Sequence, residues 1–185
     1  MNTLQTTNYK LKTKNGFSLI ELLIYAAVLA VMSTVIVNVF LGITIGRGRF
    51  TAESEVNSNL RFALEKINQD IRAASVITTP ATPAGTTSQT LVVNIGGAEG
   101  TVTYCVLSGV LRRQPNGGAC SSDSAAVTSD KVSVTAPTFT RFENTNSNLP
   151  VALGTALTIQ TSITMAYARE GFQYSATKTT TELLP

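Results

Sequence analysis

Histidine is absent from this sequence of 185 residues, cysteine occurs only twice, and charged residues make up only 14%. Without histidine the chain cannot form Ser-His or Cys-His nucleophile pairs, HExxH metal sites or ordinary imidazole ligand sets. The nucleophile motif GxSxG and the phosphate-binding Walker A motif are also missing. We therefore expect that the protein is not an enzyme and that it uses no cofactor.

Acidic side chains are sparse where a metal site would need them. Asp123 and Asp130 are the only acids in the loop region that follows residue 114. A calcium ion takes about six to eight oxygen ligands. We expect no metal site.

The small positive charge of the chain is confined to its beginning. The formal net charge is +3, and without Lys10, Lys12 and Lys14 the 11 remaining basic residues face 11 acidic ones. Arg112 and Arg113 are adjacent and would point to opposite faces of a strand, which favours a solvated strand end over a phosphate contact. Nucleic acid is therefore not an expected partner.

Residues 17–45 contain no Lys, Arg or Asp. As a helix this segment would be about 43 Å long, more than the roughly 30 Å hydrocarbon core of a bilayer. It is also longer than the apolar core of a secretory signal, about 7–15 residues. The lysines before it favour a cytoplasmic N-terminus, although Arg47 and Arg49 on the far side weaken the bias. Only Glu21 is charged, and an acid at the bilayer centre costs about 2.5–3.5 kcal/mol.

A short basic leader, then Gly16 and Phe17, then "SLIE" leading into the apolar run, resembles the class III signal of type IV pilins and type II secretion pseudopilins. In that family a prepilin peptidase cuts after the glycine on the cytoplasmic side and methylates the new N-terminal residue. The resemblance implies a cleaved leader over residues 1–16, a cleavage site between Gly16 and Phe17, and N-methylation of Phe17. Residues 17–45 then remain as the transmembrane half of a long helix.

Glu21 becomes the fifth residue of the mature chain under this interpretation. A carboxylate near a helix N-terminus is stabilised by the helix dipole, by about 0.3–1 kcal/mol. The resemblance implies a role in assembly, because this acid pairs in the family with the N-terminal amine of a neighbouring subunit. A charge pair in apolar surroundings specifies register at least as much as it stabilises. The alternative is an interfacial acid on a simple anchor.

Helical periodicity continues beyond the apolar run. One face carries apolar residues at steps of three and four, namely Val56, Leu60, Leu64, Ile67, Ile71 and Ala74. We expect a helix over residues 17–75, with residues 46–77 as its amphipathic half, and ion pairs Arg61–Glu65 and Lys66–Asp70 on the opposite face. Glycines between residues 42 and 48 permit local bending or melting.

The remainder predicts an antiparallel sheet. Residues 78–88, "TTPATPAGTTS", read as a linker that ends the helix. Alternating apolar and polar residues then predict six strands, over residues 91–95, 101–107, 110–114, 131–142, 157–167 and 172–180. A long N-terminal helix packed on this sheet makes an α+β pilin fold, with residues 78–185 as an extracytoplasmic β-rich region.

Cys105 and Cys120 are separated by 15 residues in the region expected outside the cytoplasm. Disulfides persist in such compartments, and this loop would contribute about 3 kcal/mol. We expect a disulfide, with a buried Cys105 and an exposed thiol at Cys120 as the alternative.

The motif and the expected fold favour a structural minor pilin or pseudopilin of a type IV pilus or type II secretion pseudopilus. The sequence "NLRFALEKINQDIRAAS", followed by "TYCVLSGVLRRQ", resembles the J-type pseudopilins and W-type minor pilins. Partners implied are prepilin peptidase, other pilins, an inner-membrane assembly platform and, before assembly, membrane lipid. The protein would cross the inner membrane once. The alternative is a membrane-anchored extracytoplasmic module that binds DNA or a secreted substrate.

Overall fold

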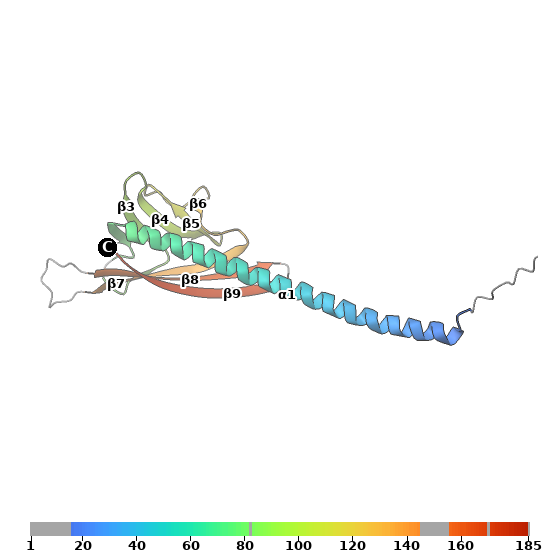
Figure 1. Ribbon diagram of the computed structural model, residues 1–185. Coiled ribbons are helices and arrows are strands. Elements are labelled where there is room, and N and C mark those ends of the chain that lie inside the picture. Colours follow the sequence, from blue (N-terminus) through green and yellow to red (C-terminus); the bar gives the residue numbers. More distant parts are fainter. Residues whose placement is uncertain (1–15, 82, 145–155, 170, 185) are drawn as a thin grey trace, which may run out of the picture. The chain divides into compact units, whose positions relative to one another are not determined.

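A computed structural model describes residues 16–81, 83–144, 156–169 and 171–184 (Figure 1). Most of the leader predicted over residues 1–16 lies outside these residues, and only Gly16 is described. The chain divides into two compact units, one ending at Ile45 and the other beginning at Gly46. Each unit is described by itself below.

The first unit consists of the beginning of helix α1 (Leu19–Ala73). Residues 16–45 are all exposed to solvent in the isolated chain. The hydroxyls of Ser33 and Thr44 donate to the carbonyls of Leu29 and Phe40, four residues earlier. Such bonds hide polar groups along an apolar helix. The helix also continues without a break through residues 42–48, so its glycines do not melt it.

The amphipathic stripe predicted for the second part of α1 is buried as expected. The six stripe residues are at most 8% exposed, and they form part of one hydrophobic core. The helix ends at Ala73 rather than at residue 75 or 77. Ser75 donates its backbone N–H to the carbonyl of Asn94, which begins the pairing of β1 (Val76–Thr79) with β3 (Leu91–Gly96). All four residues of β1 are β-branched, which favours a strand over a further helical turn and explains why this segment leaves the helix.

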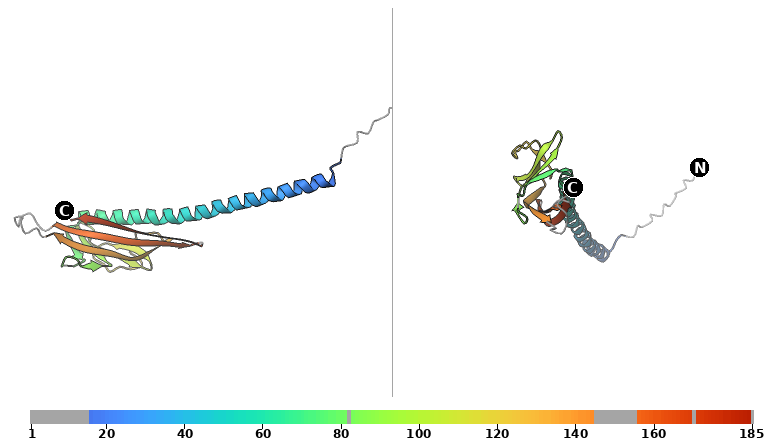
Figure 2. Two further views of the ribbon diagram at one scale, coloured as in Figure 1. Left: turned by 90° about the horizontal axis from the view of Figure 1, so that it is seen from below. Right: turned by 90° about the vertical axis from the view of Figure 1, so that its left-hand side faces the viewer.

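Two antiparallel sheets pack with the helix in the second unit. The first has the strand order β1-β3-β4-β5-β6, with β4 (Gly100–Leu107), β5 (Val110–Gln114) and β6 (Ala125–Ala126) following β3. The second has the order β2-β7-β8-β9, formed by β2 (Thr87–Ser88), β7 (Val132–Asn144), β8 (Ala156–Arg169) and β9 (Phe172–Leu183). Figure 2 shows β7, β8 and β9 running side by side.

The second part of α1 contacts both sheets (Figure 1). Its stripe joins Leu91 and Val93 of the first sheet and Ile159 and Ile163 of the second in one core. Alternation along β8 places one face in this core, because every odd-numbered residue from 157 to 167 is buried. A long helix on antiparallel sheets confirms the predicted α+β pilin-like fold.

The structure differs from the prediction in the number of sheets and strands. All six predicted strands are present, and several are longer, but β1, β2 and β6 were not predicted. Both ends of the predicted linker over residues 78–88 belong to strands β1 and β2, which pair with different sheets. Strands of two to four residues carry too little alternation to be recognised from sequence.

Candidate functional site at the N-terminal motif and its folded domain

The residues of the predicted processing motif are exposed. Gly16 has no neighbouring atoms within 4 Å of where a side chain would begin, and Phe17 is 76% exposed. The carbonyl of Ser18 accepts the first bond of α1, from the backbone N–H of Leu22, at 3.2 Å. The ring of Phe17 meets Tyr25 edge to face, with 6.5 Å between the centroids. The peptide bond between Gly16 and Phe17 therefore lies in an exposed segment just before α1.

Glu21 lies in the first turn of α1, as predicted. Its spacing from Ser18 matches the capping box, in which a serine and a glutamate three residues later bond each other's backbone N–H groups. Among the described residues, however, neither side chain forms a hydrogen bond and Glu21 forms no ion pair. The carboxylate therefore has no partner within the described part of the chain.

A mainly apolar surface without charged residues follows Glu21 as far as Ile45. The large apolar side chains between Leu22 and Ile45 are at least 50% exposed in the isolated chain. Within the described residues, α1 is the one helix whose length and composition would allow it to cross a membrane. Soluble monomers rarely expose an apolar patch of this extent, so this surface indicates a site of membrane or protein contact.

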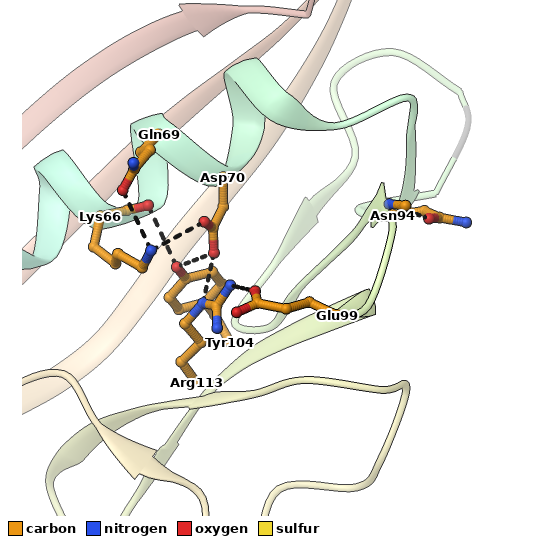
Figure 3. Close-up of polar contacts among 8 residues, drawn as sticks. Lys66, Gln69, Asp70, Asn94, Glu99, Tyr104 and Arg113 are labelled. Carbon is orange, nitrogen blue, oxygen red and sulfur yellow. Dashed lines mark hydrogen bonds and ion pairs between the residues drawn. The ribbon is translucent and has the colours of Figure 1, made fainter.

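A buried carboxylate joins the second part of α1 to the first sheet (Figure 3). Asp70 is 3% exposed, and its Oδ2 accepts hydrogen bonds at 2.7 Å from the hydroxyl of Tyr104 and from Nε of Arg113. Tyr104 and Arg113 are cross-strand partners on β4 and β5, which places both side chains on one face. Lys66 lies 3.4 Å from Oδ1, and Arg113 also pairs with Glu99.

Burial and hydrogen bonding shift the ionisation of this cluster. Burial raises the pKa of the Tyr104 hydroxyl, and the hydrogen bond to Asp70 raises it further. Burial acts to lower the pKa of Arg113, but its hydrogen bonds to Asp70 and Glu99 outweigh this and raise it. Tyr104 therefore stays neutral and Arg113 stays charged over the physiological range, which keeps the donors that Asp70 requires.

The loop between β5 and β6 is held to the first sheet by a disulfide and by Arg112. Cys105 and Cys120 are bonded, with 6.4 Å between their Cα atoms, as the sequence predicted. Arg112 donates to the carbonyls of Ser122 and Ser124, each at 2.8 Å. Arg112 and Arg113 do point to opposite faces, but the expectation of a solvated strand end is wrong, because both guanidinium groups bind within the protein.

Sequence reasoning placed Asp70 incorrectly on the solvent-facing side of the helix. The predicted pair with Lys66 is present, whereas Arg61 and Glu65 form no ion pair in the described structure. A signal for burial was available, because Asp70 follows Ile67 by three residues and precedes Ala74 by four. These spacings place it on the apolar face.

Comparison with protein families identifies the N-terminal motif. Residues 11–37 match the prokaryotic N-terminal methylation motif. This match covers the predicted leader end, Gly16, Phe17, Glu21 and the first part of the apolar segment. No curated protein and no solved structure matched the chain significantly.

The fold and the motif together define a class. The chain is a type IV pilin-like protein with an N-terminal methylation motif. Proteins of this kind are generally structural rather than enzymatic. The motif implies processing by prepilin peptidase, and with the apolar helix it indicates anchoring in the inner membrane before assembly.

Proposed function

We propose that this protein is a minor pilin or pseudopilin subunit of a type IV pilus or type II secretion pseudopilus. The methylation motif at residues 11–37, which extends into the exposed apolar first part of α1, carries the proposal. A subunit of this kind needs a helix that can exchange lipid for other helices. It also needs a folded domain outside the membrane, a role that the unit from Gly46 onward fits.

The proposed division of labour follows the chain. Residues 1–16 are a leader that prepilin peptidase removes between Gly16 and Phe17, and Phe17 is then methylated. Residues 17–45 anchor the protein in the inner membrane and afterwards pack against other pilins. The rest of α1 and the β-rich region from residue 78 lie outside the cytoplasm. The sequences of residues 59–75 and 103–114 resemble the J-type pseudopilins and the W-type minor pilins, which favours these two types.

Glu21 has a separate role in this proposal. Its free carboxylate sits one turn from the new amine of Phe17 and would pair with that amine on a neighbouring subunit in apolar surroundings. Removing one partner of a buried ion pair costs about 3–5 kcal/mol, because the other charge is left uncompensated. Processing would need Gly16 and an accessible peptide bond but not the carboxylate of Glu21, so processing and assembly should respond to different substitutions.

Mass spectrometry and crosslinking in the host cells test both steps. The mature chain should begin at methylated Phe17, and Gly16→Asp should abolish cleavage. Glu21→Val should be processed and remain in the membrane but should not crosslink to partner pilins. Glu53→Val, which removes an exposed carboxylate elsewhere on α1, is the control and should assemble normally.

Three results would contradict the proposal. A mature N-terminus beyond Ile45 would indicate removal of the whole apolar segment as a secretory signal. Normal crosslinking of Glu21→Val would leave Glu21 as an acid on a simple anchor, and a lack of any crosslink in the unaltered chain would favour a membrane-anchored module outside a filament.

A further inference from the structure

Strand β9 forms an open edge of the second sheet. It pairs with β8 in unbroken register from Phe172 to Leu183, and no other strand among the described residues pairs with it. The backbone N–H of Leu184 donates to the carbonyl of Leu157, so residue 184 faces β8. Alternation in an antiparallel ladder then turns the N–H and C=O groups of the odd-numbered residues, including Thr179, toward the open edge.

A groove of about 840 Å³ lies between this edge and α1. It is lined by Lys178 and Thr179 on β9 and by Arg61, Glu65, Asn68 and Arg72 on the helix. From Arg61 to Arg72 the helix rises about 16 Å, which is the length of about five residues of strand. Asn68 holds the wall of the groove by donating to the Thr180 hydroxyl at 3.3 Å.

Charges along the groove favour an acidic ligand. Arg72 is paired with Glu182 by two hydrogen bonds. Within the described part of the chain, Arg61 and Lys178 have no ion-pair partner, and Glu65 is the one unpaired acid lining the groove. A lysine on an open edge disfavours pairing with a neutral or basic strand, whereas an acidic strand would neutralise the charge of the lysine.

We propose that the open edge of β9 binds an extended acidic segment of a different protein by strand addition. The segment would pair its backbone with Thr179 and its odd-numbered neighbours, and its carboxylates would contact Arg61 and Lys178. Strand addition derives its affinity from main-chain hydrogen bonds and its specificity from alternate side chains. This inference stands apart from the proposed processing and assembly at the N-terminus.

The edge strands of a second copy of this chain would fit the groove poorly. The other edge strands are β1 "VITT", β2 "TS" and β6 "AA", which contain no acid and have at most four residues. Pairing of β9 with β9 of a second copy would bring the same lysine to both strands. A different protein with an acidic strand therefore fits the groove better than a second copy does.

Fluorescence anisotropy with the full chain in detergent micelles tests the proposal. The probe is a short labelled peptide that alternates glutamate with threonine or valine, and its lysine counterpart is the matched control. The acidic peptide should bind saturably and the basic one should not. Two further peptides carry N-methyl groups on their odd-numbered or their even-numbered backbone amides, which removes those hydrogen-bond donors. One of these two peptides should lose binding, because only every second amide of an added strand faces β9.

Substitutions at the edge separate strand pairing from charge attraction. Thr179→Pro removes the outward N–H without touching the ladder to β8 and should weaken binding about tenfold. Thr179→Ala loses the same hydroxyl bond to Ser162 but keeps the N–H, so it should bind as the unaltered chain does. Arg61→Glu combined with Lys178→Glu should reverse the preference toward the basic peptide.

Three outcomes would overturn the proposal. These are absence of saturable binding up to millimolar peptide, equal binding by Thr179→Pro and Thr179→Ala, and self-association of the chain that Thr179→Pro abolishes. The last result would assign the edge to a second copy.

Discussion

At the residue scale, Asp70 shows how one buried carboxylate joins a helix to a sheet. A buried charge is tolerated only when it is paired and hydrogen-bonded. Asp70 satisfies this requirement with Tyr104, Arg113 and Lys66, which come from three different elements. The cluster therefore forms only when β4, β5 and α1 are in place together.

Tyr104 gives this cluster a dependence on pH. Its pKa is raised in the folded protein above the ordinary value of 10.0, first by burial and then by the bond to Asp70. The unfolded chain therefore releases this proton at lower pH than the folded one. Its contribution to stability is complete below about pH 10 and is lost as the pH rises toward the folded value.

Tyr104→Phe tests this linkage. At neutral pH the variant should be less stable by about 1.5–3 kcal/mol, because Asp70 loses a hydrogen-bond donor. Above pH 10 the unaltered chain should lose stability faster than the variant, by at most about 1.4 kcal/mol per pH unit, so the difference narrows. Denaturant unfolding of both chains in detergent from neutral to alkaline pH measures this, and parallel pH profiles would contradict it.

At the scale of the element, α1 contains two nearby glycines with different surroundings. A side chain at Gly46 would meet no atom within 4 Å, whereas a Cβ at Gly48 would come within 2.2 Å of the Phe172 ring at the start of β9. Glycine in a helix interior costs about 1 kcal/mol relative to alanine. Packing among the described residues therefore does not require glycine at position 46, whereas the absence of a side chain at Gly48 leaves space for the ring of Phe172.

Alanine substitutions distinguish the two positions. Gly46→Ala should stabilise the folded unit by up to about 1 kcal/mol through helix propensity. Gly48→Ala should be destabilising, because displacing Phe172 outweighs that gain. Thermal unfolding monitored by circular dichroism measures both. In a Phe172→Ala background the cost of Gly48→Ala should disappear, and a persistent cost would show that the ring is not its cause.

At the scale of the whole molecule, the disulfide anchors a segment without regular secondary structure to strand β4. Residues 115–124 contain no strand, and they are held by the Cys105–Cys120 bond and by Arg112. Gln114 accepts a further bond from Ser124 at 2.6 Å. A crosslink across 15 residues stabilises by about 3 kcal/mol, mainly by restricting the unfolded chain.

Loss of this crosslink should lower stability without abolishing the fold. Cys120→Ser should melt several degrees lower than the unaltered chain, because the core formed by α1 and the sheets remains. Thiol labelling of the native, unreduced protein is the companion measurement and should find no free cysteine. Labelling of both cysteines in a freshly purified sample, or an unchanged melting temperature, would contradict this role.

Local patterns determined much of this protein. The apolar run over residues 17–45, the stripe from Val56 to Ala74 and the six longer strands were predictable because each repeats a hydrophobic period over many residues. The motif around Gly16 and the disulfide pair were recognisable from short spacings. These features depend on residues that are close in sequence or, for the disulfide, on the compartment in which the domain folds. One sequence therefore contains enough information to predict them.

Tertiary structure alone decided the rest. The end of α1 at Ala73 depends on the hydrogen bond from the backbone N–H of Ser75 to the carbonyl of Asn94. The burial of Asp70 depends on hydrogen-bond donors on Tyr104 and Arg113, which are 34 and 43 residues away in the sequence. The division of the strands into two sheets and the open edge of β9 likewise follow from long-range pairing. Periodicity shows which face of an element is buried, but which partners meet there is decided by contacts between residues far apart in sequence.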